Sequence, residues 1–327
     1  MDNLEYQRYH EAKNHTSAEF PYNTYLCSIP RDFTEVPLHW HDEMELVVIH
    51  KGRGRVSVNF QTETVFAGDI VMILPGQLHS ISCLDTYAME YENILFLPSM
   101  LISGAPDLCA ANYILPLTKA ELSTDIFLTP ARSYYPEISS CIREIDRLCS
   151  ARPTGYQLAV KGWLFQFLFY LVCHQKEQTS FTRLQTKHLE KMKRILSYIE
   201  AHFSEPISVK KVAELTYYSK SHFMKFFKTY TGKGFTEYLN DYRLARAAEM
   251  LRSTDLSLLE IAARSGFENL SYFNRMFKRK YGISPGKYRD IKSPEVPKGT
   301  FRDCKQSPRS RTSPDFGSSP IQIKNNG

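Results

Sequence analysis

The spacing of apolar residues separates a strand-rich first part of the chain from a helical remainder. Residues 20–98 contain short apolar stretches, such as the alternation in Arg55–Phe60 and the run Ile70–Leu74, bounded by turn residues. This pattern predicts many short strands in a small barrel or sandwich. The glycines that we expect at strand ends are Gly52, Gly54, Gly68 and Gly76.

Beyond Tyr135 the apolar residues recur at helical spacing. One amphipathic helix should run from there to about Cys149, and Arg152–Gly155 should break it. A second helix over about Tyr156–Gln175 is apolar on most sides, so we expect it to be buried.

The rest of the chain divides by composition. Residues 177–186 are polar and resemble a linker, and helical patterns then continue to about Arg289. The tail 291–327 is basic and rich in Ser and Pro, and it has too few apolar residues to offset the entropy of ordering, so we expect disorder there.

Composition places the chain among soluble globular proteins. Its 327 residues favour two domains, and its 43% hydrophobic and 23% charged residues are ordinary values. The seven cysteines form no CxxC pair, which argues against a disulfide framework or a zinc finger. We see neither a secretory signal nor an apolar run near the ~20 residues of a membrane span, and therefore expect a bacterial cytoplasmic protein.

Charge is distributed unevenly. Residues 1–185 carry 14 Lys and Arg against 21 Asp and Glu, whereas residues 186–290 carry 20 against 11. An acidic part joined to a basic part suggests that the basic part meets a polyanion such as nucleic acid.

A repeat inside the basic region sharpens this interpretation. Val212–Gly232 and Ile261–Gly282 match each other, with Phe223 opposite Phe273 and Phe227 opposite Phe277. Each copy reads as helix, turn, helix. Ser208 is a predicted N-cap in the first copy. In the second copy, Ser257–Glu260 is a predicted capping box, and Gly266 is predicted in the turn.

The last helix of each copy has two different faces. Phenylalanines lie on one side, and Ser221, Met224, Lys225 and Lys228, or Ser271, Asn274, Arg275 and Lys278, lie on the other. A helix that reads the major groove needs this arrangement, because Arg275 could pair with guanine and Asn274 with adenine. The alternative is that these are solvated charged faces of a helical bundle.

The segment between the copies, Phe235–Arg252, predicts one unbroken helix of about 27 Å. Such a connector could hold the two recognition helices about one DNA turn, or ~34 Å, apart.

Residues 187–290 resemble the DNA-binding domain of the AraC/XylS family of bacterial regulators, most closely in IAARSGFENLSYFNRMFKRKYGISPGKYR. The resemblance implies a transcription regulator, more often an activator, with double-stranded DNA as a partner and RNA polymerase as a further candidate. Met224 departs from the polar residue that is commoner at its position. The residues predicted to contact DNA are Lys220, Ser221, His222, Met224, Lys225, Lys228, Asn269, Ser271, Tyr272, Asn274, Arg275, Lys278 and Arg279.

The first part of the chain carries a second resemblance. His39-Trp40-His41-Asp42-Glu43-Met44-Glu45 and Gly68 to His79 are similar to the two cupin motifs, although Cys83 replaces the usual Asn. His39, His41 and Glu45 are separated from one another by even numbers of positions. Because side chains alternate between the two faces of a strand, we expect all three on one strand face. Two hypotheses stay open for His39, Trp40, His41, Glu45 and His79: a polar pocket for a small molecule such as a carbohydrate, or a divalent metal site formed by His39, His41, Glu45 and His79. A third hypothesis is that these polar residues only satisfy one another inside a structural barrel.

Together these patterns predict an α+β multidomain chain. Residues 1–135 form a cupin-like β-barrel sensor, 136–176 a helical dimerisation segment, and 177–186 a linker, followed by an all-α domain over 187–290 with two helix-turn-helix units joined by a long helix. The favoured function is a ligand-responsive transcription regulator acting as a homodimer, with no required cofactor. The alternatives are a metal-dependent cupin enzyme fused to a DNA-binding module, and an architectural DNA binder. The helices at 136–176 could instead only cover the barrel.

Overall fold

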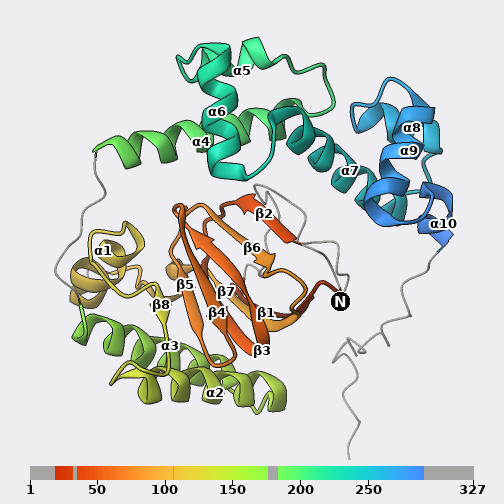
Figure 1. Cartoon of the computed structure of the whole chain (residues 1–327). Coiled ribbons are helices and arrows are strands. Elements are labelled where there is room, and N and C mark those ends of the chain that lie inside the picture. The colour runs from red at the N-terminus through yellow and green to blue at the C-terminus, as the bar shows by residue number, and fades with distance from the viewer. Residues whose placement is uncertain (1–18, 32–34, 106, 176–182, 291–327) are drawn as a thin grey trace, which may run out of the picture. The chain divides into compact units, whose positions relative to one another are not determined.

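The computed structural model describes residues 19–31, 35–105, 107–175 and 183–290, so the predicted tail 291–327 lies outside the described residues. Within these ranges a strand-rich region is followed by helices (Figure 1). The strands are β1 (Tyr22–Ile29), β2 (Glu35–His39), β3 (Met44–Val58), β4 (Gln61–Phe66), β5 (Ile70–Ile73), β6 (His79–Cys83), β7 (Met89–Phe96) and β8 (Phe127–Leu128).

Strand β3 organises the barrel because it belongs to both of its sheets. Its first half pairs antiparallel with β7 and β5, and its second half pairs with β4 and β6. The strand order β1-β7-β3-β5-β8 forms one side, and β2 joins the other side through β6.

The prediction that Gly52 and Gly54 end strands is wrong, because both lie inside β3. The register of β3 against β7 shifts between Ile49 and Lys51, and Gly52 has a φ of +76°. A Cβ at Gly52 would lie 1.9 Å from the Ala88 carbonyl oxygen. These glycines therefore let one long strand bend from one sheet into the next instead of stopping it.

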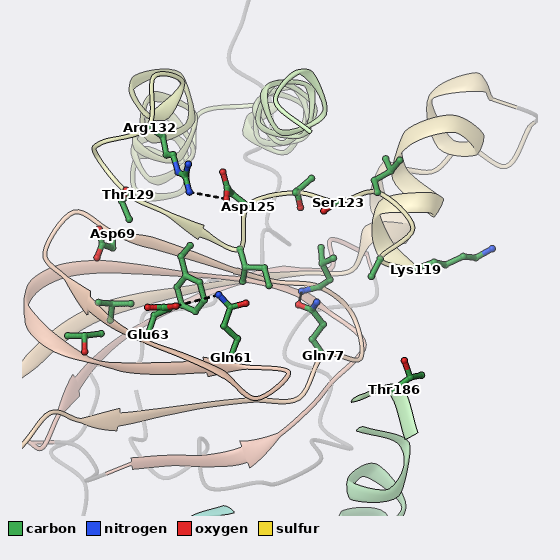
Figure 2. A pocket seen from close by; sticks show the side chains of 18 residues that line it. Gln61, Glu63, Asp69, Gln77, Lys119, Ser123, Asp125, Thr129, Arg132 and Thr186 are labelled. Carbon is green, nitrogen blue, oxygen red and sulfur yellow. Dashed lines mark hydrogen bonds and ion pairs between the residues drawn. The ribbon is translucent and has the colours of Figure 1, made fainter. Parts of the chain in front are cut away.

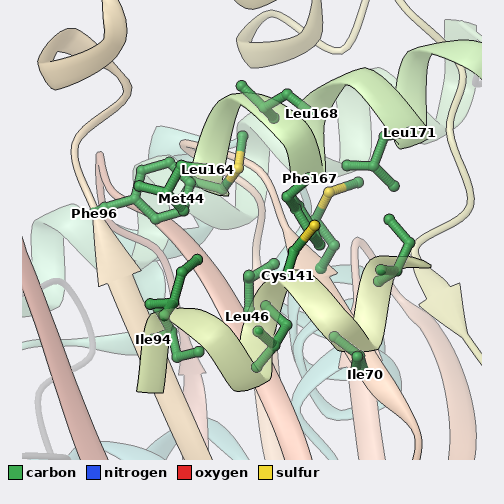
Figure 3. Close-up of a cluster of buried hydrophobic side chains, with 14 of the residues drawn as sticks. Met44, Leu46, Ile70, Ile94, Phe96, Cys141, Leu164, Phe167, Leu168 and Leu171 are labelled. Atoms are coloured by element: carbon green, nitrogen blue, oxygen red, sulfur yellow. The ribbon is translucent and has the colours of Figure 1, made fainter. Parts of the chain in front are cut away.

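Two helices pack on one face of the barrel, α2 (Tyr135–Ala151) and α3 (Tyr156–Cys173), close to the predicted bounds, with Arg152 in a left-handed conformation at the break. The prediction that the second helix is buried is wrong for one side of it, because α3 exposes Leu158, Phe165 and Phe169. Figure 3 shows the shared core, where Met44, Leu46 and Phe96 of the sheet meet Phe167 of α3. Between β7 and α2 lie three short helical turns, η2 (Pro98–Leu101), η3 (Ala110–Ile114) and α1 (Leu115–Thr118).

Alternate residues of β3 face opposite sides. Met44 and Leu46 pack toward α2 and α3, whereas Val47 and Ile49 belong to a second core inside the barrel with Val56 and Tyr91 of β7. By the same alternation Glu45 points into the barrel.

The remaining described helices form the two helix-turn-helix units that the repeat predicted. They are α4 (Arg183–His202), α5 (Val209–Leu215), α6 (Lys220–Thr231), α7 (Phe235–Ser253), α8 (Leu258–Arg264), α9 (Leu270–Tyr281) and α10 (Pro285–Asp290). Helix α4 begins inside the predicted linker 177–186, so the last four residues of that segment are helical. No helix among the described residues is both long enough and apolar enough to cross a membrane.

Local signals explain these boundaries. The Ser208 side chain caps α5, and Ser257 and Glu260 form the predicted capping box of α8. Helix α7 is 19 residues long and buries Tyr238, Leu244 and Leu251 among others, so it serves as the common core of both units. The order predicted from the sequence, a cupin-like sheet region followed by an all-helical region with a long connecting helix, is confirmed.

Candidate DNA-binding helices and a buried histidine centre

Helices α6 and α9 are built from matching local devices. Each has twelve residues. The Ser219 hydroxyl accepts a hydrogen bond from the His222 amide at 3.2 Å, and the Asn269 side-chain oxygen accepts one from the Tyr272 amide at 2.8 Å. Gly232 and Gly282, each with a φ near +75°, end the two helices.

Each of these helices buries one face and exposes the other. The buried residues are Phe223, Phe226 and Phe227 in α6, and Phe273, Met276 and Phe277 in α9. The exposed residues are Lys220, Ser221, His222, Lys225 and Lys228 in α6, and Ser271, Tyr272, Arg275, Lys278 and Arg279 in α9. The predicted division of faces is confirmed for these residues, so both helices offer cations and hydroxyls to solvent.

Three residues of the predicted DNA-contacting set differ from this picture. Met224 and Asn274 occupy equivalent positions and are half-buried. The Asn274 side-chain oxygen is buried and has no hydrogen-bond partner within the described residues. Asn269 is exposed, but its side chain is already used in the cap of α9. These three contacts therefore stay predictions that require side-chain rearrangement.

Arg275 has one neighbour on its own helix. Its guanidinium carbon lies 5.4 Å from the centre of the Tyr272 ring, and the Tyr272 hydroxyl accepts a hydrogen bond from the Asn240 amide at 3.3 Å. The aromatic ring can restrict the arginine without neutralising it, which suits a residue that must present a fixed pair of donors.

A second group of chemically active residues lies inside the barrel. One ring nitrogen from each of His39, His41 and His79 lies within 4.8 Å of the other two. The His41 Nε2 is 3.0 Å and the His79 Nε2 is 3.1 Å from the same oxygen, Glu45 Oε2. All four residues are at most 4% exposed. We call this group the histidine centre.

Backbone carbonyls fix the orientation of all three rings. The Nδ1 atoms of His39, His41 and His79 lie 2.8, 3.2 and 2.9 Å from the carbonyl oxygens of Pro37, Glu43 and Gln77. A neutral imidazole has one N–H, so donation from Nδ1 leaves Nε2 with its lone pair. In this structure the Nε2 atoms of His41 and His79 face the Glu45 carboxylate, which can only accept, so each of these two atoms carries a proton when it hydrogen-bonds to Glu45. The three ring nitrogens and Glu45 therefore converge on one small space.

Burial and charge oppose each other in this centre. Burial, aided by the neighbouring His79 and His41, lowers the pKa of His39 well below its usual value. Burial would also lower the pKa of His41, but its hydrogen bond to Glu45 and the charge of that carboxylate outweigh burial and raise the pKa. Burial would raise the pKa of Glu45, but the hydrogen bonds from His41 and His79 hold it well below its ordinary value.

The predicted reason for this convergence is wrong even though the residues do meet. His39 ends β2, Glu45 lies in β3, and His41 lies in the bend between them, so no single strand face carries all three. Antiparallel pairing of β2 with β6 places His39 opposite His79. Trp40 is half-buried and is not one of the converging ligands.

Two features of the barrel were missed from the sequence. Glu43 is buried, and one of its carboxylate oxygens lies 3.5 Å from His41 Nδ1. Its place between His41 and Glu45 in the sequence was a signal that could have found it. A cleft of about 790 Å³ lies along β4 and the segment 119–132, and the histidine centre is not part of its lining. Its residues come from distant parts of the chain and form no motif.

Two family models match the chain at the regions just described. A model described as an AraC-like ligand binding domain matches residues 30–106, and one described as a helix-turn-helix domain matches residues 212–291. The chain is 24% identical over 288 residues to an uncharacterized HTH-type transcriptional regulator, YdeC, of Bacillus subtilis, covering 88% of this chain and 98% of that protein.

Two further relatives carry functional names. The regulatory protein PocR of Salmonella typhimurium is 40% identical over 47% of this chain and 54% of its own length. The HTH-type transcriptional activator RhaS of Mannheimia succiniciproducens is 28% identical over 80% of this chain and 92% of its own length. The chain thus carries the two domains of AraC-family transcriptional regulators, an AraC-like ligand-binding domain followed by a C-terminal helix-turn-helix domain.

Proposed function

We propose that this protein is a sequence-specific transcription activator that inserts α6 and α9 into successive major grooves. The observation that carries the proposal is the repeated two-faced helix, in which three buried apolar residues anchor each helix and leave Lys225 and Arg275 in solvent. Helix α7, about 28 Å long, is close to the spacing of one DNA turn.

The exposed cations divide into two roles under this proposal. Arg275 lies in the middle of its helix beside Ser271, where a bidentate contact to guanine would select sequence. Lys228, Lys278 and Arg279 lie in the last turns of their helices. We assign them to phosphates, which add affinity that depends on salt but do not select sequence.

The test begins with selection of genomic DNA fragments by the full chain, followed by gel-shift titration of the selected site. Arg275→Ala should weaken binding by about 1–3 kcal/mol and relax preference at one base pair, and Lys225→Ala should act at a different base pair. Lys210→Ala is the matched control, because Lys210 is exposed on α5, outside the recognition helices. Unchanged affinity and base preference in the Arg275 variant would contradict the proposal.

We further propose that the histidine centre binds a divalent transition metal. Three oriented imidazoles and one carboxylate form a donor set suited to zinc, iron, manganese or nickel. Two details support the fit: one ring nitrogen from each histidine lies within 4.8 Å of the other two beside the buried Glu45, and every Nδ1 is held by a carbonyl, an outer contact that is typical of metal-binding histidines. When bound, a metal would supply a charge that satisfies the buried Glu45.

Metal analysis of the full chain tests this directly. After chelation and return of Zn²⁺ or Mn²⁺, one equivalent should bind and raise the melting temperature, with about 2.7 kcal/mol of stabilisation at a hundredfold excess over Kd. His79→Ala should abolish both effects, whereas His50→Ala, a change at an exposed histidine, should not. Stoichiometric binding that survives His39→Ala and His79→Ala together would contradict the assignment.

A homodimer is the third part of the proposal. Helix α3 buries Val160, Leu164 and Phe167 on one side. It exposes Leu158, Phe165 and Phe169, spaced seven and four residues apart, on another. That spacing makes one apolar stripe, and a second copy would cover it. Light scattering should show a dimer that Phe165→Asp converts to a monomer.

The enzyme alternative is less well supported, because the named relatives are regulators and the histidine centre is closed to solvent. As a DNA-binding regulator the protein should act in the bacterial cytoplasm, where the chromosome lies. Turnover of a small substrate by the metal-loaded chain would restore the enzyme alternative.

A further inference from the structure

The cleft along β4 is a feature of the barrel that the histidine centre does not explain. Its volume of about 790 Å³ is within the 300–1,000 Å³ typical of small-molecule sites. Figure 2 shows its lining, with Gln61 and Glu63 from β4 on one side and Ser123, Asp125 and Arg132 on the other.

Three polar side chains in the lining are buried and held in place. Asp69, Gln77 and Asp125 are 7–8% exposed. Oxygen Oδ2 of Asp69 accepts a hydrogen bond from the Phe66 amide, and Oε1 of Gln77 accepts one from the Leu74 amide, both at 2.8 Å. Each side chain is thereby fixed before any ligand arrives, which lowers the entropic cost of binding.

The second polar atom of two of these side chains remains available. Within the described part of the chain, Asp69 Oδ1 and Gln77 Nε2 have no hydrogen bond, and neither is sealed from solvent. They offer the cleft one fixed acceptor and one fixed pair of donors. Asp125 is different, because Arg132 and the Tyr134 hydroxyl already occupy its two oxygens at 3.1 and 2.7 Å.

Charge in the cleft disfavours anions. The carboxylates of Glu63, Asp69 and Asp125 outnumber the cations of Lys119 and Arg132, and the ion pair of Asp125 with Arg132 is internally balanced. Among the described residues Glu63 and Asp69 form no ion pair, although Glu63 accepts a hydrogen bond from Gln61 at 3.4 Å, and their carboxylates can accept hydrogen bonds from ligand hydroxyls. The lining also includes hydroxyl side chains and apolar residues, among them Thr64, Ser123, Thr124, Thr129, Leu122, Ile126 and Phe127.

We infer that this cleft, and not the histidine centre, binds the small-molecule effector, and that the effector is a neutral polyhydroxylated compound such as a sugar or polyol. The inference deepens the proposed function by naming the site and the ligand class. Fixed donors and acceptors beside a small apolar surface match the hydroxyls and C–H faces of such a molecule. More than half of the lining comes from residues 119–132, beyond the segment matched by the ligand-binding model.

The cleft also has a direct connection to the histidine centre. Gln77 offers its side-chain amide to the cleft, while its backbone carbonyl lies 2.9 Å from His79 Nδ1. It follows Gly76, whose φ is +72°, in the tight turn between β5 and β6. An effector that draws the Gln77 amide toward itself would therefore act on the residue that orients His79.

The test uses ligand-observed NMR and calorimetry on the full chain with D-galactose, L-arabinose and D-mannitol, and with D-galacturonate as the anionic counterpart. At least one neutral compound should bind with a stoichiometry of one, and D-galacturonate should bind more weakly. Asp69→Asn should raise its Kd about tenfold, because an acceptor of hydroxyl hydrogen bonds becomes a donor. Glu144→Gln, on an exposed face of α2, should leave the Kd unchanged.

Three results would overturn the inference: no binding by any neutral compound at 50 mM, preferred binding of the anion, or binding that is lost in His79→Ala but kept in both Asp69→Asn and Glu63→Gln. Matched melting temperatures show that the variants fold. Gel-shift titration of the same samples separates the two proposals. If the chain binds DNA but no polyol, the cleft assignment fails while the DNA-binding function stands.

Discussion

The two helix-turn-helix units reach the same recognition surface by different local means. Their recognition helices have equal lengths, equivalent caps and equivalent buried triplets. Their turns differ in residue type at the position with left-handed backbone. That position is Tyr217 in the first unit, with a φ of +56°, and Gly266 in the second, with a φ of +83°. The buried face of each helix, and not the chemistry of the turn, therefore fixes how its polar face is presented.

The surroundings of the two turns explain why only one requires glycine. A Cβ at Gly266 would lie 2.4 Å from the carbonyl oxygen of Phe203 and 2.7 Å from Arg243 Nε. Arg243 in turn donates hydrogen bonds to the carbonyls of Phe203 and Glu205 at 2.8 and 2.7 Å. Tyr217 is 86% exposed, so its side chain meets no such obstacle. The second turn is packed against the end of α4, whereas the first faces solvent.

Gly266→Ala should give the largest effect. Left-handed backbone costs a residue with a Cβ about 1–2 kcal/mol, and the contact with a backbone carbonyl adds overpacking of about 1–3 kcal/mol. We expect a loss of about 3 kcal/mol in urea unfolding of the full chain followed by helical circular dichroism. A loss below about 1 kcal/mol would show that the second turn can move away from Phe203.

Removal of the N-caps should affect the two units equally. Ser219→Ala and Asn269→Ala each delete one acceptor for an amide of the first helical turn and should each cost about 1 kcal/mol. The same unfolding measurement applies, with Ser219→Asp and Asn269→Asp as cap-preserving controls. Unequal losses would show that the two helices depend on their caps to different degrees.

Tyr217→Asn should stabilise the protein slightly. Asparagine tolerates left-handed backbone better than tyrosine does, and the position is exposed, so we expect a gain of about 0.5 kcal/mol. The equivalent change Gly266→Asn should instead destabilise, because Asn has a Cβ. A loss of stability in Tyr217→Asn would mean that the tyrosine ring makes a contribution of its own.

The smallest effect concerns pH. Hydrogen bonds from the hydroxyl and amide of Ser257 hold the pKa of Glu260 below its ordinary value. A depressed folded-state pKa contributes stability above the unfolded-state value of about 4.3, and that stability disappears as pH falls through the folded-state value. Thermal unfolding of Glu260→Gln should therefore depend less on pH between 6 and 3. The first unit has Lys211 at this position, so Lys211→Gln should leave the pH dependence unchanged.

Short-range signals in the sequence were enough to predict the helical region. The capping box at Ser257 and the inward phenylalanines depend on residues three or four positions apart, and both were predicted correctly. The barrel was harder, because strand pairing joins distant segments. The alternation of side chains along a strand could not reveal the bend near His41 or the passage of β3 through Gly52. The cleft was also hidden, because it combines Asp69 with Arg132, and these two residues share no local sequence pattern.

Strand β3 has a consequence for how the barrel unfolds. Its 15 residues supply hydrogen-bond partners to β4, β5, β6 and β7. Neither sheet can therefore unfold without breaking the hydrogen bonds between β3 and the strands of the other sheet. The two sheets should therefore melt in one cooperative step, with no stable half-barrel intermediate. Amide protons on either side of Gly52 and Gly54 should then exchange with deuterium at a common, slow rate.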